Sequence, residues 1–338
     1  MNDRLIRALA LQESDRIPFV PAVYEHKAWF IGRTPSEVCR DESLLVESVL
    51  AEYEALRADA IVVGMDVYNI EAEACGCGVT YFDPPDTSIP ALTPGAEAIP
   101  DGVTVREVKV PDPLSAGRMP IMVDATERVR RLIGSEVEVM GAMSGPFSLA
   151  ASLMGPTDLF LAMAGEPDRA REVIAFAAEV VVAYGRSFAA KGITAALFDS
   201  QASPQVISPR SYREFVLEPT RGVIHDLLRA GMRYVPLVIG GNTDPIVDAY
   251  ADTGGNYLLC DGGASVGRFL PVCQAARRAF RRNIPSEFLV SSSVDEIRRR
   301  AREDVASARG YPGFIMGTGV VPYGIPTEKI VAVAQELG

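Results

Sequence analysis

The chain has 338 residues, a formal net charge of −11 at neutral pH and 48% hydrophobic residues. That length and composition are typical of a globular protein with a substantial core, built as one large α/β domain or as two smaller ones. The negative charge argues against nucleic acids or anionic membranes as partners. Two arginine-rich stretches, at 277–282 and 298–302, fall in predicted helices or at their ends and are interpreted as solvated surface.

The N-terminal residues lack the apolar segment of a secretion signal, and no run of about 18 apolar residues occurs. The five cysteines are an odd number in a large chain, which fits a reducing compartment better than a disulfide framework. We therefore expect a cytoplasmic protein.

Eight short apolar segments rich in β-branched residues alternate with longer segments of helical period. This alternation is typical of parallel βα units and predicts a (β/α)8 barrel as a single domain over residues 1–338. The predicted strands lie at residues 19–25, 60–66, 137–144, 195–200, 234–240, 256–261, 280–284 and 314–319.

Helix start signals follow several of these strands. Ser208 before Pro209 and Asp244 before Pro245 are typical of a cap residue with proline at the first helical position. The S-S-S-V-D-E-I-R-R-R segment places serine and acidic residues at a helix start and arginines near its end, as the helix dipole favours.

One connection, at residues 67–136 after the second strand, is longer than a βα crossover needs. It is rich in Gly and Pro and holds two strand-like pieces, G-V-T-Y-F and V-T-V-R-E-V-K-V. We interpret it as an insertion at the barrel mouth. Barrel enzymes build their sites from the loops at that face, so the insertion is expected to wall or cover a site.

Polar residues end most of the predicted strands, and in a barrel they converge on one site. Asp66 is the favoured functional carboxylate because it closes a strongly apolar strand. In E-A-E-A-C-G-C-G, an extended backbone would put Glu71 and Glu73 on one face, where they could bind a metal or share a proton. The candidate set is Glu25, His26, Asp66, Asn69, Glu71, Glu73, Ser144, Asp199, Gln201, Asn242, Asp261, Asn283 and Thr318.

Several other chemistries lack their motifs. Cys75 and Cys77 form only a C-x-C pair, a weak metal signal, and are interpreted as small buried cysteines. Of the two histidines, His26 follows a strand and His225 falls within a helical pattern. No G-x-S-x-G elbow, Walker loop or G-x-G-x-x-G after a strand occurs, which argues against hydrolase, kinase and nicotinamide functions.

The order of several motifs resembles the uroporphyrinogen decarboxylase superfamily, and within it the corrinoid-dependent methyltransferases. The motifs are D-R-I-P-F-V-P, D-V-Y-N-I-E-A-E-A-C-G-C, G-P-F-S-L-A-A-S-L-M-G, F-D-S-Q-A-S-P-Q-V-I-S-P-R-S-Y-R-E-F-V, V-I-G-G-N-T-D-P-I and M-G-T-G-V-V-P-Y-G-I-P-T-E-K-I. They span nearly the whole chain, and the resemblance implies the same barrel.

The resemblance implies two functional branches. The decarboxylase branch carries an arginine-rich R-Q-A-G-R segment for its porphyrinogen carboxylates, where this chain reads Y-E-H-K-A-W-F-I-G-R. The coenzyme M methyltransferases are implied to bind zinc through His-x-Cys and a later Cys. The matching positions here are Val238, Gly240 and Thr318, so zinc is not expected at that place.

The sequence therefore predicts a corrinoid-dependent methyltransferase without the usual zinc site. The cobalamin is expected on a separate corrinoid-binding protein, since no D-x-H-x-x-G motif occurs. The small molecule is a methyl donor or acceptor, with tetrahydrofolate a further candidate. The general acid would be Asp66, Glu71, Glu73 or His26. A non-porphyrin decarboxylase or lyase and a non-catalytic binding barrel stay open as alternatives, as does a homodimer.

Overall fold

Seven parallel strands form a curled sheet in a computed structural model that describes residues 3–338. Their order along the sheet is β1-β4-β5-β6-β7-β8-β9, so each strand pairs with the next one along the chain apart from the short β2 and β3. The strands are β1 (Ala60–Val63), β4 (Glu138–Ser144), β5 (Thr194–Phe198), β6 (Leu237–Val238), β7 (Tyr257–Cys260), β8 (Ala279–Ile284) and β9 (Phe314–Thr318). Seven of the eight predicted strands are thereby confirmed.

The eighth position is filled by an extended segment near the N-terminus, at residues 18–22. Phe19 and Ala22 form parallel bridges to Met316 and Val320, and on the other side the amide of Asp59 donates to the carbonyl of Phe19. The segment therefore lies between β9 and β1 and completes the (β/α)8 barrel. Its predicted end is wrong, because Glu25 already has helical backbone and His26 begins helix α2 (His26–Phe30).

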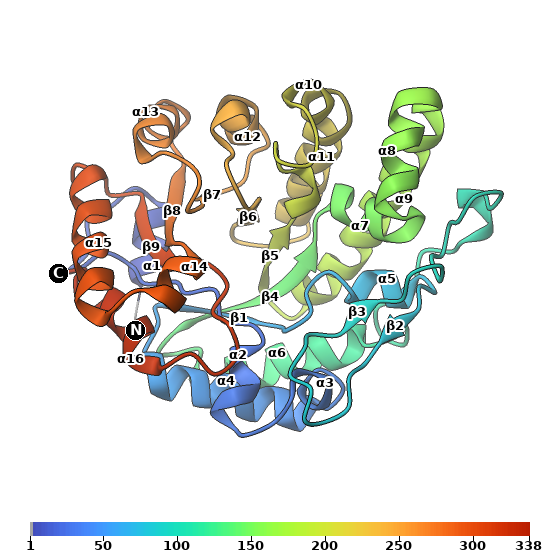
Figure 1. The fold of residues 1–338 in the computed structure, drawn as a ribbon. Helices are drawn as coiled ribbons and strands as arrows, with labels where there is room; N and C mark the ends of the chain where they lie inside the picture. The colour runs from blue at the N-terminus through green and yellow to red at the C-terminus, as the bar shows by residue number, and fades with distance from the viewer. Residues whose placement is uncertain (1–2) are drawn as a thin grey trace.

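The helices surround the sheet, and Figure 1 shows them as a ring outside the strands. The longer helices are α4 (Glu42–Leu56), α6 (Met119–Ile133), α7 (Pro146–Met154), α8 (Pro156–Gly165), α9 (Pro167–Ala190), α11 (Leu217–Arg229), α13 (Val266–Ala276), α15 (Val294–Ser307) and α16 (Thr327–Ala334). Shorter helical pieces are α1 (Arg4–Leu9), α3 (Pro35–Val38), α5 (Ile70–Ala74), η1 (Val105–Glu107), η2 (Ser200–Ala202), α10 (Pro209–Ser211), η3 (Tyr212–Val216), η4 (Asp244–Ile246), α12 (Val247–Asp252) and α14 (Ser286–Ser291).

Two apolar clusters follow from the alternation of side chains along the strands. The larger one lies between the sheet and the helices and includes Val63, Leu197 and Phe280. The smaller one fills the barrel interior with residues such as Val62 and Ile315. Helix α9 is long and apolar enough to cross a membrane by length and composition, but more than half of its apolar window is buried in the larger cluster. Its composition is therefore that of a core helix.

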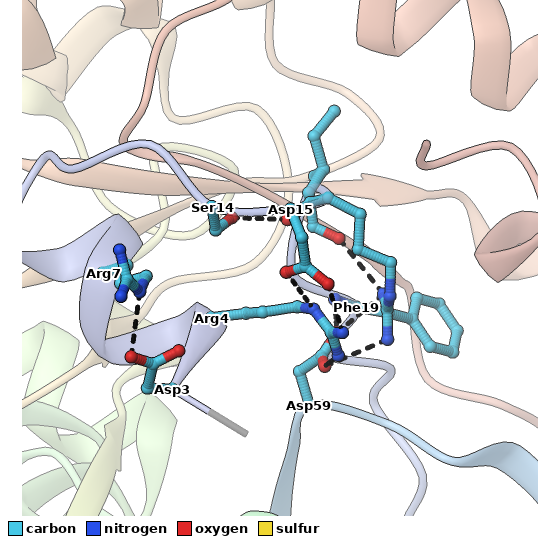
Figure 2. A network of polar contacts seen from close by, with 9 residues as sticks. Asp3, Arg4, Arg7, Ser14, Asp15, Phe19 and Asp59 are labelled. Atoms are coloured by element: carbon cyan, nitrogen blue, oxygen red, sulfur yellow. Dashed lines mark hydrogen bonds and ion pairs between the residues drawn. The ribbon is translucent and has the colours of Figure 1, made fainter. Parts of the chain in front are cut away.

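A polar network ties the N-terminal helix to the closing segment (Figure 2). Asp59 is fully buried and accepts hydrogen bonds from the Arg4 guanidinium at 3.0 Å, from Arg16 at 3.0 Å and from the Phe19 amide at 2.7 Å. Arg4 also pairs with Asp15 at 2.6 Å. This shared carboxylate fixes the strand at the seam where the barrel closes.

The predicted caps are confirmed at two of three positions. Ser208 caps α10, and Ser293 caps α15 in a reciprocal pair with Glu296. The Asp244 prediction is wrong: η4 has Thr243 at its N-cap position, and the Asp244 carboxylate accepts instead from the Ser265 amide at 2.9 Å. Asp244 thus links two neighbouring βα loops.

The long connection runs from β1 to β4. It contains α5, the antiparallel pair β2 (Val79–Thr80) and β3 (Ala91–Leu92), η1 and α6. The piece V-T-V-R-E-V-K-V was expected to be extended, but Val105–Glu107 is a helical turn with Thr104 and Glu107 bonded to each other. Because α6 serves as the crossover helix packed on α4 and β4, the added part of the connection is its first half.

Candidate functional site

A cavity of about 1130 Å³ lies where the carboxyl ends of the strands meet, and we call it the mouth cavity. Residues of all eight barrel positions or the loops after them line it, together with the segment at 89–97 around β3. Ala91, Pro94, Gly263, Glu287 and Val320 are both cavity-lining and exposed, so the cavity opens to solvent between the insertion and the loops after β7, β8 and β9. The predicted site is therefore at the face where barrel enzymes place their chemistry.

The charged side chains on the cavity wall are few. Four are acidic (Asp66, Glu97, Asp261 and Glu287) and one, Arg281, is basic. Most of the remaining wall is apolar or carries hydroxyl and amide groups. A cavity of this size and character is suited to a small molecule that is oriented by a few polar groups.

Asp66 is held by an arginine that sequence reasoning missed. Two guanidinium nitrogens of Arg118 face its two carboxylate oxygens at 3.0 and 2.7 Å, and Asn69 donates to it at 3.3 Å. The same arginine binds Glu73 at 2.6 Å, and Glu73 also accepts from the Tyr81 hydroxyl at 3.0 Å. Burial raises the pKa of the Asp66 carboxyl, and the Arg118 guanidinium acts in the opposite direction.

Glu71 and Glu73 do not share a face, because the backbone there is helical rather than extended. Glu71 is fully buried and accepts from the Ser144 amide at 2.7 Å and the Ser144 hydroxyl at 3.2 Å. Burial raises the pKa of Glu71 to about 7. Glu71 therefore ties α5 to the end of β4, and it lies behind the wall of the mouth cavity rather than in it.

A chain of hydroxyl groups lies on the cavity wall beside β5. The Tyr68 hydroxyl donates to the Ser200 hydroxyl at 2.7 Å, and the Gly240 amide approaches the same oxygen at 3.4 Å. Burial raises the pKa of Tyr68 to about 12, so its phenol stays protonated. With two donors aimed at its oxygen, Ser200 has its own proton left to donate into the cavity.

Asp261 is the second predicted carboxylate on the cavity wall. Its two oxygens accept from the Gly241 amide at 2.8 Å and from the Asn283 side chain at 3.2 Å. These bonds orient the carboxylate after β7 and leave lone pairs for a donor on a ligand. Gln201 also lines the cavity.

The other predicted residues lie outside the cavity lining. The His26 imidazole is buried, stacks on Trp29 at 5.0 Å and contacts the Pro322 carbonyl at 3.0 Å, and burial lowers its pKa to about 4. Asp199 accepts from the Ser148 amide at 2.7 Å at the start of α7. The remaining members are Glu25 at the start of α2, Ser144 bound to Glu71, Asn242 exposed and bonded to the Asp244 amide, and Thr318 accepting from the Ala22 amide.

The three positions at which the resemblance implies zinc ligands offer none here. Val238 is apolar, Gly240 has no side chain, and the Thr318 hydroxyl accepts a backbone bond. Within residues 3–338, no group of three or more His, Cys, Asp or Glu side chains could hold a metal ion. Burial raises the pKa of Cys77 to about 11, so this thiol is protonated. The donor set does not fit tetrahedral zinc.

The features missed from the sequence are mostly cations and aromatic hydroxyls. The prediction that Arg281 and Arg282 are solvated is wrong: both are buried, at 2% and 4% exposed, because they lie on β8, which is covered on both faces. Arg118 lies 52 residues from Asp66, so no local pattern joins them. Tyr24 and Tyr68 also line the cavity, whereas the sequence prediction named their neighbours Glu25 and Asn69.

Relatives at low identity fall into two groups. The chain is 29% identical to a methylated-thiol–coenzyme M methyltransferase of Methanosarcina mazei over 65% of this chain and 60% of that protein. It is 25% identical to the methylcobamide:CoM methyltransferase MtaA of Methanosarcina barkeri (98% and 96%). It is 27% identical to a uroporphyrinogen decarboxylase of Thioalkalivibrio sulfidiphilus (99% and 97%).

Solved structures confirm the fold. A methyltransferase from Methanosarcina mazei superposes with a TM-score of 0.87 at 24% identity and covers 99% of this chain and 97% of its own. The sequence profile of the uroporphyrinogen decarboxylase (URO-D) family matches residues 1–337. Since that profile extends over nearly the whole chain and the observed barrel agrees with it, the chain belongs to the uroporphyrinogen decarboxylase family.

Proposed function

We propose that this protein is a methyltransferase that moves a methyl group between a corrinoid held by a separate protein and a small molecule bound in the mouth cavity. The methyltransferases among its relatives support this reaction class, although decarboxylases match at similar identity. The free cysteines fit the reducing cytoplasm in which we place the reaction.

The observation that carries the proposal is the charge of the cavity wall. A uroporphyrinogen brings eight carboxylates, and its recognition calls for several cations placed to receive them. The mouth cavity offers one arginine, Arg281, against four carboxylates, Asp66, Glu97, Asp261 and Glu287. One of these, Asp66, is neutralised by Arg118, and the wall still has an acidic excess. A smaller substrate with little negative charge suits it better.

The corrin, when bound by its own protein, carries the methyl group. This chain then has to bind the small molecule, orient it toward the open side of the cavity and exclude water from the reacting atoms. The exposed rim at Val320 and around β3 is where the partner would approach. A corrinoid protein is therefore the expected macromolecular partner.

The cavity wall also supplies a proton. A heteroatom that loses its methyl group keeps the bonding electron pair and needs a proton unless it leaves as a stable neutral molecule. Asp66 is poorly suited to this role because Arg118 faces both of its oxygens, and Glu71 does not reach the cavity. The proposed donor is the Ser200 hydroxyl, which gives its proton to the heteroatom as it takes the phenol proton of Tyr68, and solvent then restores the phenol. Asp261 is the proposed acceptor for an N–H group of a ligand, such as that of a reduced pterin.

The proposal is tested with methylcob(III)alamin and cob(I)alamin, added with and without a corrinoid protein from the same source. The corrin absorbance is followed with methylated amines, sulfides and aryl ethers as donors and with thiols and tetrahydrofolate as acceptors. We expect a spectral change with at least one small molecule. Ser200→Ala and Tyr68→Phe should slow an ether donor about 100-fold, which is typical for loss of general acid catalysis.

The control variant is Tyr323→Phe, which removes a hydroxyl that donates to the Arg33 carbonyl at 3.1 Å, away from the lining of the mouth cavity. It should keep the wild-type rate. A quaternary amine donor leaves without a proton, so its transfer should be nearly unaffected by Ser200→Ala. Release of carbon dioxide from a carboxylic acid, with no dependence on corrinoid, would replace the proposal by the decarboxylase alternative.

A further inference from the structure

Arg281 is a buried cation without an ionic partner. It lies on the inward face of β8, is 2% exposed and lines the mouth cavity. Its Nε has no hydrogen-bond partner, and across residues 3–338 no carboxylate lies within 4.0 Å of its guanidinium. Arg282, the next residue, points outward and binds Asp304 at 3.1 Å and the Asp261 carbonyl at 2.7 Å. The two adjacent arginines therefore differ in having or lacking a carboxylate partner.

The aromatic neighbour of the Arg281 guanidinium is the Tyr257 phenol, whose pKa burial raises and the guanidinium lowers. The guanidinium lies 5.9 Å from the centre of the Tyr257 ring, and Tyr24 and Asn283 line the same part of the cavity. On β9, opposite Asn283, stands Gly317, where a Cβ would come within 3.1 Å of the Arg281 Cδ and 2.2 Å of the Val20 carbonyl oxygen. A side chain at 317 would displace the arginine stem.

Burying a guanidinium away from any anion is unfavourable, because the ion loses part of its hydration and gains no equivalent ionic contact. Such a group persists where function requires it, and a ligand anion in the adjacent cavity would restore the missing interaction. The planar guanidinium suits a carboxylate, which it can bind through two parallel hydrogen bonds.

We propose that Arg281 binds a carboxylate group of the small molecule that occupies the mouth cavity. This rests on the proposed function for the reaction itself, and it specifies the substrate class as a methylated or methyl-accepting carboxylic acid. Arg281 is on β8 and Ser200 follows β5, with β6 and β7 between them. A molecule bound through its carboxylate at Arg281 would therefore extend across the cavity and present a heteroatom toward Ser200.

The test measures binding without any corrinoid, so that it does not depend on methyl transfer. The probes are benzoate, 4-methoxybenzoate and (trimethylammonio)acetate, each compared with its primary amide by calorimetry. We expect the wild-type protein to bind at least one carboxylate about tenfold or more tightly than the amide. Arg281→Met should reduce that preference to less than twofold and leave the affinity for the amide unchanged.

The control variant is Arg299→Met, which removes an exposed arginine on α15 and should keep the preference. Arg281→Lys retains the charge without the bidentate geometry and should keep only part of the preference for the carboxylate over its amide. The proposal is overturned if no carboxylate is preferred over its amide, or if the preference survives Arg281→Met. A retained preference without methyl transfer in the corrin assay would count against the proposed function alone.

A second measurement excludes a purely structural role. Because no carboxylate within residues 3–338 pairs with Arg281, the unliganded Arg281→Met variant should melt at or above the wild-type temperature. Arg282→Met breaks the buried bond to Asp304 and should melt clearly lower. If both variants lost the same amount of thermal stability, Arg281 would be a structural residue and the proposal would be wrong.

Discussion

Arg118→Met tests whether Asp66, on the wall of the mouth cavity, and Glu73, beside that wall, depend on one cation. The substitution keeps most of the apolar stem and removes the guanidinium that contacts Asp66 and Glu73. Asp66 is 4% exposed and Arg118 is 5% exposed, so water cannot readily take the place of the lost partner. The variant therefore leaves a buried carboxylate with only Asn69 as a side-chain donor.

The expected loss in free energy of unfolding is about 3–5 kcal/mol, the range for removing one partner of a buried ion pair. Glu73 contributes less to this loss because its side chain is 23% exposed and it keeps the Tyr81 hydroxyl. Asp66→Asn alone should be less harmful, since Arg118 retains Glu73. The double variant Asp66→Asn with Arg118→Met should be more stable than the sum of the two single losses predicts, because no buried charge is left.

The loss in Arg118→Met should also depend on pH. Without the guanidinium, burial outweighs the remaining hydrogen bond from Asn69, so the folded-state pKa of Asp66 lies above the unfolded value. A group of this kind contributes stability below its unfolded pKa, and the contribution disappears as the pH rises through the folded pKa. The deficit should therefore be smaller at pH 5 than at pH 8. Urea unfolding at both pH values measures it. A loss below about 1 kcal/mol, or a deficit equal at both pH values, would refute the reasoning.

Three further outcomes are expected. Burial raises the pKa of Glu71 from 4.5 to about 7, so the stability that the protonated Glu71 contributes is lost as the pH rises between those values. Glu71→Gln should therefore reduce the fall in the free energy of unfolding from pH 5 to pH 8, measured by urea unfolding. Asp59→Ala should cost about 2 kcal/mol or more by urea unfolding, because Arg4, Arg16 and the Phe19 amide lose a shared acceptor; an unchanged midpoint would contradict the role given to the seam. Gly145→Ala places a Cβ 2.3 Å from the Asp199 Cγ and should lower stability by about 1–3 kcal/mol, whereas Gly165→Ala, with nothing within 4 Å, serves as its control.

The strands could be predicted from the sequence because their apolar β-branched runs are short and separated by helical segments. The least well predicted strand ends lie in the segment before Glu25 and at β6, which is reduced to Leu237–Val238. In both places backbone hydrogen bonds join the segment to its neighbours outside an assigned strand, such as Leu197 to the Pro236 carbonyl and Val20 to the Met316 carbonyl. The fold class depends on the repeated pattern rather than on any single boundary, and so it survived these errors.

The site was predicted less completely because its electrostatics come from long-range contacts. Asp66 was identified from its place at the end of an apolar strand, but its partner Arg118 lies 52 residues further along the chain, within the long connection. Because the backbone of α5 is helical, the Glu71 side chain contacts Ser144 and the Glu73 side chain contacts Arg118. No local sequence pattern indicates these two partners. Local pattern locates strand ends, whereas side-chain partners depend on the packed structure.

Gly240 and Arg281 together bear on how this barrel departs from a zinc-dependent methyltransferase. Zinc stabilises a thiolate acceptor, and at Gly240 the chain offers only a backbone amide directed at the Ser200 hydroxyl. A site whose matching positions offer no zinc ligands would have to place its small molecule by other means. Arg281 places a fixed charge on the cavity wall at β8, and in the proposed function the Ser200 hydroxyl after β5 would donate a proton. If both proposals hold, binding energy from a carboxylate remote from the methyl group would orient the reacting heteroatom, which is the general way that enzymes use non-reacting parts of a substrate.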